Sequence, residues 1–296
     1  MFEELERAAR QLGCALERDL PLSSHTTFRI GGPAALAITP ADPGTLPPLL
    51  RLCRERQIPW MVLGNGSNLL ARDGGYDGVL FRLREGSPEF EGNTVTCPAG
   101  TPLKTLCRAA RDRGLSGLEF AYGIPGTVGG ALFMNAGAYG GEMKDRVTGA
   151  LAADEGGIRL IPVEEMGLAY RRSAFMDRRD QVILSVAFTL VPDDPEAIAA
   201  RMEELIRRRR EKQPLEYPSA GSYFKRPEGY YAGALIEECG LKGARVGDAQ
   251  ISEKHAGFLV NRGGATCAQV LALEERVRDT VLRDRGVLLE REVQLV

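Results

Sequence analysis

Apolar side chains recur every three or four positions over residues 2–12, a spacing that predicts a helix with one buried face. The same spacing predicts further helices over residues 46–56, 103–113, 196–212, 230–238 and 266–285. Gly13, Gly114 and Gly286 stand close to the ends of three of these segments, where a helix often closes in a left-handed residue. We therefore expect amphipathic helices that end at defined positions.

Short runs of residues with high strand propensity separate these helices. They predict strands within residues 25–32 and over residues 35–39, 60–63, 79–83, 94–97 and 182–191, and a turn and strand over 239–246. Residues 149–153 and 158–161 predict a hairpin. Alternating apolar and polar residues predict a last strand over 287–296, with Glu292 on its polar face.

Short strands interleaved with few helices indicate an α+β fold over residues 1–191. The segment Pro192-Asp193-Asp194-Pro195 predicts a break in the chain before the following helix. A chain of 296 residues is long enough for two or three domains, and it shows no internal repeat.

The charge of the chain excludes two broad classes of partner. A formal net charge of −2 and a pI near 5.9 give no general attraction to nucleic acid or to a membrane surface. The basic run Arg207–Arg210 would wrap around all faces of one helix and has no aromatic residues between its members. No apolar run approaches the ~20 residues that span a bilayer, and the acidic start is unlike a signal peptide. We expect a cytoplasmic protein that binds neither nucleic acid nor membrane.

The residues that could bind a metal are too scattered to predict a metal site. The six cysteines lack paired spacing and indicate reduced, mostly buried thiols. His25 and His255 are far apart, and no cluster of His, Asp and Glu accompanies either. They are also the only possible bases for a serine nucleophile, and the Gly-x-Ser-x-Gly motif is absent, so a serine hydrolase is poorly supported.

Glycine is unusually dense over residues 116–142. Pro125-Gly126 predicts a turn, and Thr127 is placed to cap a short helix over 128–135. Backbone amides before such a helix are a natural seat for a phosphate, although a glycine-rich connection between domains is an equal alternative.

A second glycine turn, residues 64–68, follows the strand predicted over 60–63. Its sequence Gly-Asn-Gly-Ser-Asn resembles the opening of a dinucleotide fingerprint, but the third glycine and a long following helix are missing. Consecutive amides at Gly and Asn can still form a nest for an anion. Two such loops in one chain favour the binding of a phosphate-containing ligand.

Four motifs follow one another along the chain. They are Gly64–Asn68, Gly123–Gly130 with Asn135–Gly140, Tyr170-Arg171-x-Ser173, and Ala220-Gly221-Ser222-x-Phe224-Lys225. Each motif alone has low specificity, but the ordered set is highly specific, and the resemblance covers residues 26–292. Together the motifs resemble the UDP-N-acetylenolpyruvoylglucosamine reductase family, flavoenzymes that complete UDP-N-acetylmuramate in bacterial wall synthesis.

The resemblance implies an FAD-binding domain of the vanillyl-alcohol-oxidase type in two α+β subdomains, followed by an α+β substrate-binding domain. We expect the subdomains over residues 1–83 and 84–194 and the substrate domain over 195–296, with the last strand carrying Glu292 back to the active site. A monomer is expected.

The resemblance also assigns the glycine loops to the diphosphate of FAD. The residues implied to hold it are Gly64, Asn65, Gly66, Ser67, Asn68, Gly123, Ile124, Pro125, Gly126, Thr127, Gly129 and Gly130. Arg29 would also lie beside the cofactor.

The implied reaction is the NADPH-dependent, FAD-mediated reduction of UDP-N-acetylglucosamine enolpyruvate to UDP-N-acetylmuramate, a peptidoglycan precursor on which cell shape and division depend. Hydride would pass from NADPH to flavin N5 and then to the enolpyruvyl methylene. Negative charge then develops beside the substrate carboxylate, and its stabilisation is usually the largest catalytic contribution. The resemblance places Arg171 and Glu292 at this carboxylate and makes Ser222 the acid that protonates the enolate.

The substrate diphosphate requires cations. The implied substrate-binding residues are Tyr170, Lys225, Arg226, Lys254 and His255, with Lys242 and Arg245 as further candidates. Arg226 stands where the family usually has Asn. The chain also lacks the extra segment whose tyrosine closes over the nucleotide in the longer subclass, so it resembles the shorter subclass.

Two alternative functions remain open from the sequence. Another FAD-dependent oxidoreductase of the same fold would keep both glycine loops but has no reason to keep Ser222 with Arg171 and Glu292. A non-catalytic nucleotide-binding protein would carry no flavin and would show no yellow colour.

Overall fold

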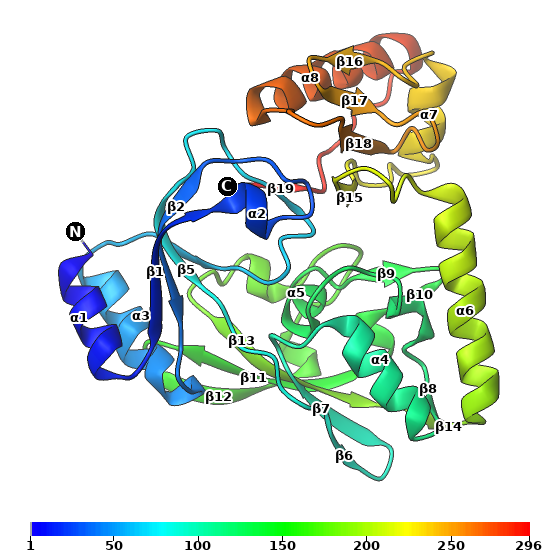
Figure 1. The fold of residues 1–296 in the computed structure, drawn as a ribbon. Coiled ribbons are helices and arrows are strands. Elements are labelled where there is room, and N and C mark those ends of the chain that lie inside the picture. Colours follow the sequence, from blue (N-terminus) through cyan, green and yellow to red (C-terminus); the bar gives the residue numbers. More distant parts are fainter. Residues whose placement is uncertain (1) are drawn as a thin grey trace. The chain divides into compact units, whose positions relative to one another are not determined.

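The computed structural model describes residues 2–296 and divides the chain into two compact units (Figure 1). Unit 1 comprises Met1–Arg18, Leu36–Asn65 and Gly78–Arg207, and unit 2 comprises Asp19–Ala35, Gly66–Asp77 and Arg208–Val296. The expected division at residues 83 and 194 stays a prediction.

Over residues 2–296 the α-helices are α1 (Glu3–Gln11), α2 (Leu22–His25), α3 (Leu46–Glu55), α4 (Leu103–Asp112), α5 (Val128–Phe133), α6 (Pro195–Lys212), α7 (Ala232–Glu238) and α8 (Cys267–Arg285). Short 3₁₀ helices are η1 (Pro43–Thr45), η2 (Glu119–Ala121), η3 (Met143–Asp145), η4 (Val163–Glu165) and η5 (Ala174–Met176). The helices predicted from apolar spacing are all present.

The strands as far as residue 192 are β1 (Ala15–Pro21), β2 (Pro33–Thr39), β3 (Trp60–Val62), β4 (Leu69–Leu70), β5 (Tyr76–Phe81), β6 (Glu89–Glu91), β7 (Thr94–Pro98), β8 (Leu115–Ser116), β9 (Gly137–Ala138), β10 (Gly141–Glu142), β11 (Val147–Asp154), β12 (Gly157–Pro162), β13 (Val182–Thr189) and β14 (Val191–Pro192). The later strands are β15 (Ser219–Ser222), β16 (Arg245–Val246), β17 (Ala249–Ile251), β18 (Phe258–Asn261) and β19 (Gln294–Leu295).

Unit 1 is built around a five-stranded sheet in the order β12-β11-β13-β7-β6. The predicted hairpin forms β11 and β12, which pair with Asp154 opposite Gly157. The helix α4 buries residues at positions i, i+3, i+4 and i+7, from Leu103 to Ala110, in the same core as β7 and β13. A second core lies under α1 and α3, which pack on each other (Figure 1).

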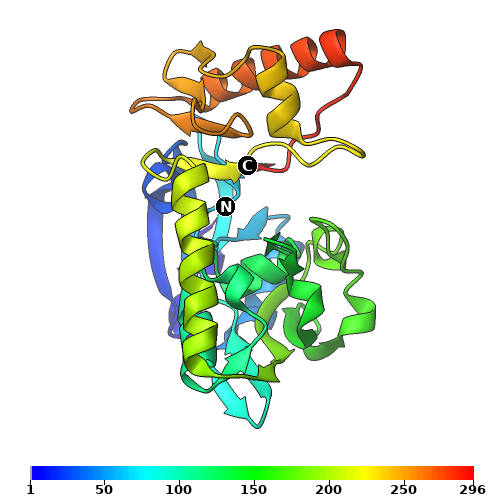
Figure 2. The same ribbon diagram turned by 90° about the vertical axis from the view of Figure 1, so that its right-hand side faces the viewer.

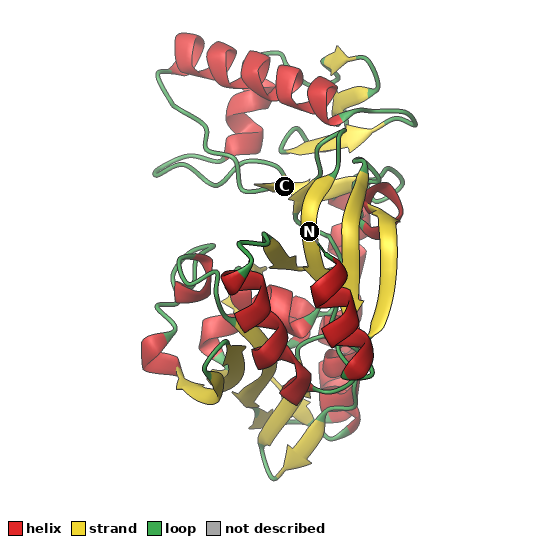
Figure 3. Cartoon of the chain, turned by 90° about the vertical axis from the view of Figure 1, so that its left-hand side faces the viewer, coloured by secondary structure: helices red, strands yellow, loops and turns green. Residues whose placement is uncertain are grey.

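Unit 2 contains a four-stranded sheet in the order β15-β18-β17-β16, covered by α7 and α8 (Figures 2 and 3). Thr266 and Gln269 form a capping box at the start of α8, and Gly286 ends this helix with φ +69°. The buried face of α8, which includes Leu273, Val277 and Val281, belongs to the apolar core of this unit.

Two strand predictions are wrong. Residues 26–32 form no strand, because Leu22–His25 make the helix α2 and the following backbone bonds to side chains: Asn261 Nδ2 donates to the carbonyls of Phe28 and Arg29. Of the strand predicted over 287–296, the structure keeps Gln294–Leu295, which pair in parallel with Leu69–Leu70. The residues between α8 and β19 form no strand and a single bridge, between Arg291 and Phe224.

The described residues contain neither a membrane-spanning helix nor a metal-binding cluster, and the state of the cysteines was predicted from the sequence. Within residues 2–296, no helix is long and apolar enough to cross a membrane. In the same residues no cluster of three or more His, Cys, Asp and Glu side chains is placed to hold a metal ion. The six cysteines are unpaired and all except Cys239 are buried, as predicted.

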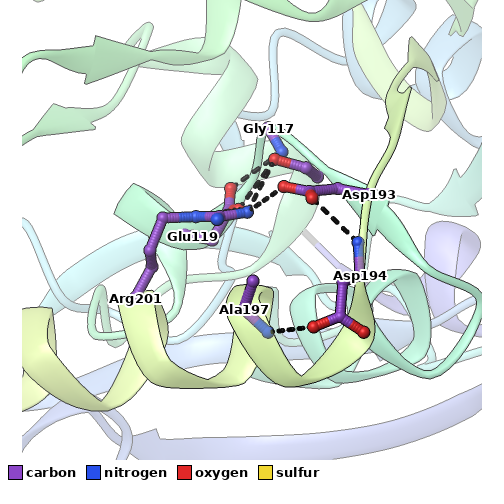
Figure 4. A network of polar contacts seen from close by, with 7 residues as sticks. Gly117, Glu119, Asp193, Asp194, Ala197 and Arg201 are labelled. Atoms are coloured by element: carbon purple, nitrogen blue, oxygen red, sulfur yellow. Dashed lines mark hydrogen bonds and ion pairs between the residues drawn. The ribbon is translucent and has the colours of Figure 1, made fainter.

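An ion-pair network in unit 1 joins the start of α6 to the glycine-rich segment (Figure 4). Arg201 Nη2 lies 2.8 Å from Glu119 Oε1 and also contacts Asp193. Glu119 accepts hydrogen bonds from the Gly117 N–H and from Ser116 Oγ, and Asp194 caps α6 through the Ala197 N–H. Partial burial opposes the ionisation of Glu119, but these bonds outweigh it and lower its pKa.

Replacing Arg201 with Met should lower the free energy of unfolding by about 1–2 kcal/mol at pH 7, since Glu119 loses a charged donor while its side chain is only 11% exposed. A lowered pKa stabilises the fold above the unfolded value, and this stability is lost as pH falls through the folded value. The variant should therefore lose less stability than the wild type between pH 7 and pH 3. Urea unfolding followed by circular dichroism measures both effects.

Arg207→Met provides a matched control on the same helix, because the pair between Arg207 and Glu204 is largely exposed. Equal destabilisation by the two substitutions would contradict the importance of the Arg201 network.

Candidate functional site

The structure brings together two of the predicted loops within unit 1. Asn65 Nδ2 donates to the carbonyl of Pro125 over 2.7 Å. A Cβ on Gly64 would lie 2.7 Å from Thr127 Oγ1, so the backbone at residue 64 approaches this side chain closely enough to require glycine. The turn at 64–65 therefore packs against the residues that start α5.

The first amides of α5 are used within the protein. The N–H groups of Val128 and Gly129 donate to the carbonyls of Thr101 and Ala99, and the Gly130 N–H donates to Thr127 Oγ1. The cap by Thr127 was predicted and is confirmed. In contrast, the N–H groups of Gly64, Asn65 and Thr127 form no hydrogen bond to any of residues 2–296. These three amides, rather than the helix N-terminus, can be offered to an anionic group.

The other half of the 64–68 turn belongs to unit 2 and packs on residues 25–27. Gly66 has φ +58°, and a Cβ there would lie 2.4 Å from the His25 carbonyl oxygen. Thr26 Oγ1 is buried beside it without a hydrogen-bond partner. A buried hydroxyl without a partner is costly unless a ligand or water completes it. The predicted site residue Arg29 is exposed nearby and has φ +56°, which is uncommon for a residue with a side chain.

Arg171 lies in unit 1, in a tight turn between Ala169 and Arg172, whose backbones exchange two hydrogen bonds of 3.0 and 3.1 Å. Its φ is +52°, and its guanidinium donates to the Gly137 carbonyl over 2.9 Å. The same guanidinium lies 5.2 Å from the ring centre of Tyr170, which is exposed. A left-handed conformation at a non-glycine residue costs about 1–3 kcal/mol and is typical of functional positions.

The turn that carries Arg171 is fixed by a buried asparagine that the sequence reading did not single out. Asn135 donates to the carbonyl of Ala169 and to Glu142, over 2.8 and 2.7 Å, and its Oδ1 accepts from the Lys144 N–H. Ser173 Oγ donates to the Phe133 carbonyl over 2.7 Å. The position of Asn135 within the glycine-rich motif was the available signal.

Ser222 and Glu292 both lie in unit 2. Ser222 is exposed at the end of β15, after an irregularity in its pairing with β18 and a left-handed Gly221. The Glu292 N–H donates to the carbonyl of Tyr223 over 2.9 Å, and the Glu292 carbonyl accepts from Asn68 Nδ2 over 3.3 Å. The backbone of Glu292 is thus bonded both to the neighbour of Ser222 and to the 64–68 turn.

The predicted substrate-binding cations of unit 2 all contact protein groups. Lys225 Nζ lies 3.1 Å from Glu290, Lys254 Nζ donates to the Arg210 carbonyl over 2.6 Å, and Arg226 stacks 4.0 Å from the ring centre of Tyr231. Burial lowers the pKa of His255, whose Nδ1 accepts from the Gly257 N–H. His255 is therefore neutral near pH 7 and could offer a hydrogen bond but no charge.

Comparison with known proteins first defines the class. Residues 34–160 match the family model of an FAD binding domain, a range that includes Gly64, Asn65 and residues 123–130. The unpaired amides of Gly64, Asn65 and Thr127 and the close approach at Gly64, all within unit 1, fit a diphosphate group. With its α+β fold, the chain is a flavin-dependent oxidoreductase.

The second domain and the full-length relatives then define the family. Residues 213–296 match the UDP-N-acetylenolpyruvoylglucosamine reductase, C-terminal domain. Reductases of this name from Clostridium botulinum and Clostridium novyi are 47% and 46% identical, covering 94% and 95% of this chain and 91% and 92% of the relatives. The crystal structure of the Thermus caldophilus reductase is 39% identical, has a TM-score of 0.81, and the match covers 95% of this chain and 99% of that one.

The chain therefore belongs to the UDP-N-acetylenolpyruvoylglucosamine reductase family. The resemblance stated from the four motifs is confirmed, as are the α+β class, the order of the FAD-binding and C-terminal domains and the shorter subclass.

Replacing Gly64 with Ala should displace Thr127 and disturb the paired loops. We expect FAD affinity to fall at least about tenfold, the equivalent of 1.4 kcal/mol or more. Gly74→Ala is a matched control, because a Cβ there meets nothing within 4 Å. Titration of each apoprotein with FAD, followed by flavin fluorescence, measures the affinities. Unchanged affinity in the Gly64 variant would exclude this close approach from cofactor binding.

Proposed function

We propose that this chain reduces UDP-N-acetylglucosamine enolpyruvate to UDP-N-acetylmuramate, with electrons from NADPH. The observation that carries the proposal is that one chain matches both the FAD binding domain and the C-terminal domain of the reductase family, with 47% identity to a named reductase over 94% of its length. We further propose that the protein acts as a cytoplasmic monomer and supplies a peptidoglycan precursor.

The residues of the two glycine loops would hold the cofactor through backbone groups. The amides of Gly64, Asn65 and Thr127 in unit 1, and of Gly66 and Ser67 in unit 2, form no hydrogen bonds to residues 2–296. Donors of this kind suit the oxygens of a diphosphate. When bound there, FAD supplies the two-electron chemistry of the reaction.

Arg171 would bind the carboxylate of the enolpyruvyl group. A guanidinium stays charged at any physiological pH and can present two parallel N–H donors to a carboxylate. Its turn is fixed by Asn135 and Ser173, so the group is oriented before substrate arrives. Charge stabilisation that needs no rearrangement during the reaction is the most effective kind.

Ser222 would deliver the proton that completes the reduction. A serine hydroxyl is a poor acid in water, so it requires a neighbouring positive charge, and Lys225 is three residues away in the sequence. Glu292 would help to fix the carboxylate end of the substrate, and its backbone is bonded to the residue after Ser222. Lys225, Lys254, Arg226 and Tyr170 would bind the nucleotide diphosphate part, with His255 as a neutral partner.

The assay that tests the function uses the flavin-loaded protein. Under anaerobic conditions NADPH should bleach the flavin absorbance, and UDP-N-acetylglucosamine enolpyruvate should restore it. Recovery with an unrelated alcohol- or sugar-derived acceptor, but not with the enolpyruvyl nucleotide, would favour another oxidoreductase of this fold. A protein that takes up no flavin would support the non-catalytic alternative.

In this assay, Ser222→Ala should leave flavin reduction by NADPH within about twofold of wild type and slow reoxidation by the enolpyruvyl substrate by about 10²–10⁴-fold, the usual contribution of a general acid. Ser219→Ala, in the same strand, is the control. Stopped-flow absorbance separates the two half-reactions. Equal losses in both would show that Ser222 is not the proton donor.

Arg171→Lys keeps the charge but removes the planar pair of donors and the bond to Gly137. We expect kcat/KM for the enolpyruvyl substrate to fall by about 10²–10³-fold, as when a charge-stabilising donor is removed. Arg172→Lys is the neighbouring control, because Arg172 is exposed and pairs with Asp177. Steady-state kinetics compare the two. Full activity of the Arg171 variant would argue against bidentate recognition.

A further inference from the structure

Unit 2 buries one carboxylate that no step of the proposed reaction uses. Glu274 lies on α8 together with the buried Leu273 and Val277, and its side chain is only 7% exposed. Removing an ionised carboxylate from water is costly unless it is paired and hydrogen-bonded. The donors that offset the cost of burying the Glu274 charge therefore show which segments of the chain this carboxylate holds in place.

Two segments outside α8 supply those groups. Tyr223 Oη donates to Glu274 Oε2 over 2.7 Å, and Arg291 Nη1 lies 3.2 Å from the same oxygen. On the helix itself, Arg278 Nη1 lies 3.8 Å from Oε1. Tyr223 is 1% exposed, and burial, followed by the adjacent negative charge, raises its pKa, so its hydroxyl remains a donor.

Each of the two partners outside α8 is the immediate neighbour of a proposed catalytic residue. Tyr223 follows Ser222, and Arg291 precedes Glu292. Their backbones are bonded as well: the Glu292 N–H donates to the Tyr223 carbonyl over 2.9 Å, and the Lys225 N–H donates to the Glu290 carbonyl over 2.8 Å. A single carboxylate on α8 thus anchors both segments by their side chains.

We propose that Glu274 is a positioning residue that fixes Ser222 and Glu292 with respect to each other by holding Tyr223 and Arg291. The inference rests on the proposed function. Well-packed apolar residues often replace buried ion pairs without loss of stability, so stability alone does not account for the Glu274 network. Catalysis is sensitive to that geometry, since a displacement of about 1 Å can cost about 10²-fold in rate.

Glu274→Gln tests the proposal, since it keeps the shape of the side chain but removes the charge that joins both partners. We expect reoxidation of the reduced flavin by UDP-N-acetylglucosamine enolpyruvate to slow by about 10–10²-fold. Flavin reduction by NADPH and the KM for NADPH should stay within about twofold of wild type. Glu275→Gln is the matched control, because the neighbouring Glu275 is exposed on the same helix.

Tyr223→Phe is the second variant and keeps the proposal testable if Glu274→Gln fails to fold. It retains the buried ring and removes only the hydroxyl, so it should slow reoxidation in the same selective way. If both residues act through the same contact, the double variant should be no slower than the slower single variant, which is a non-additive result.

Wild-type reoxidation rates in both variants, or equal slowing of the two half-reactions, would overturn the positioning role while leaving the proposed function intact. Failure of the wild-type protein to be reoxidised by the enolpyruvyl substrate would instead overturn the proposed function, and this inference with it.

Discussion

The hydrogen bonding of residues 290–296 is the constraint on which the arrangement of unit 2 depends. On one side the N–H groups of Glu292 and Lys225 link this segment to residues 223–225. On the other side Gln294 and Val296 bond to Asn68 and Leu70, and the Arg72 N–H donates to Val296. Each such bond contributes about 0.5–1.5 kcal/mol net, so the buried Leu289 and Val293 are needed to hold the segment in place. The segment fixes the backbone of residues 68–72 relative to that of residues 223–225.

The sequence suggested that the glycines of the motif loops make room for a phosphate-containing ligand, but the structure gives two of them a different role. At Gly64 and Gly66 the atoms that exclude a Cβ belong to the protein itself, namely Thr127 Oγ1 and the His25 carbonyl oxygen. Close packing of one loop on its neighbour is therefore what requires glycine there. Because the chain in these loops turns without forming regular secondary structure, several amides are left without protein acceptors. The amides that we propose to hold an anion are therefore left free of acceptors within residues 2–296 by the packing of the loops.

Periodicity predicted the elements whose partners lie close in the sequence or whose apolar face is continuous. The helix over Leu103–Asp112 and the hairpin around Asp154–Gly157 are of this kind. The strand predicted within 25–32 is absent, and the one predicted over 287–296 is reduced to Gln294–Leu295, because the backbone partners of these segments, such as Asn261 and Asn68, are distant and partly side chains. No local pattern reports such partners. The family resemblance named Arg171, Ser222 and Glu292, but the anchoring roles of Asn135 and Glu274 depend on contacts that exist only in the fold.

Asn135 and Glu274 each fix a segment that carries a proposed catalytic residue, Asn135 through amide hydrogen bonds and Glu274 through a buried charge. The Arg171 turn carries a left-handed residue, which would relax if the chain around it were free. The Asn135 side chain donates to the Ala169 carbonyl and to Glu142 and accepts from the Lys144 N–H, and these bonds suffice because the arginine charge itself stays partly exposed. The Ser222 and Glu292 segments come from distant parts of the chain and need a longer reach. A glutamate on α8 provides it, and its buried charge requires the strong donors Tyr223 and Arg291 to be in place. A network of this kind is stable only when every member is satisfied, so it specifies one arrangement of the two segments rather than several.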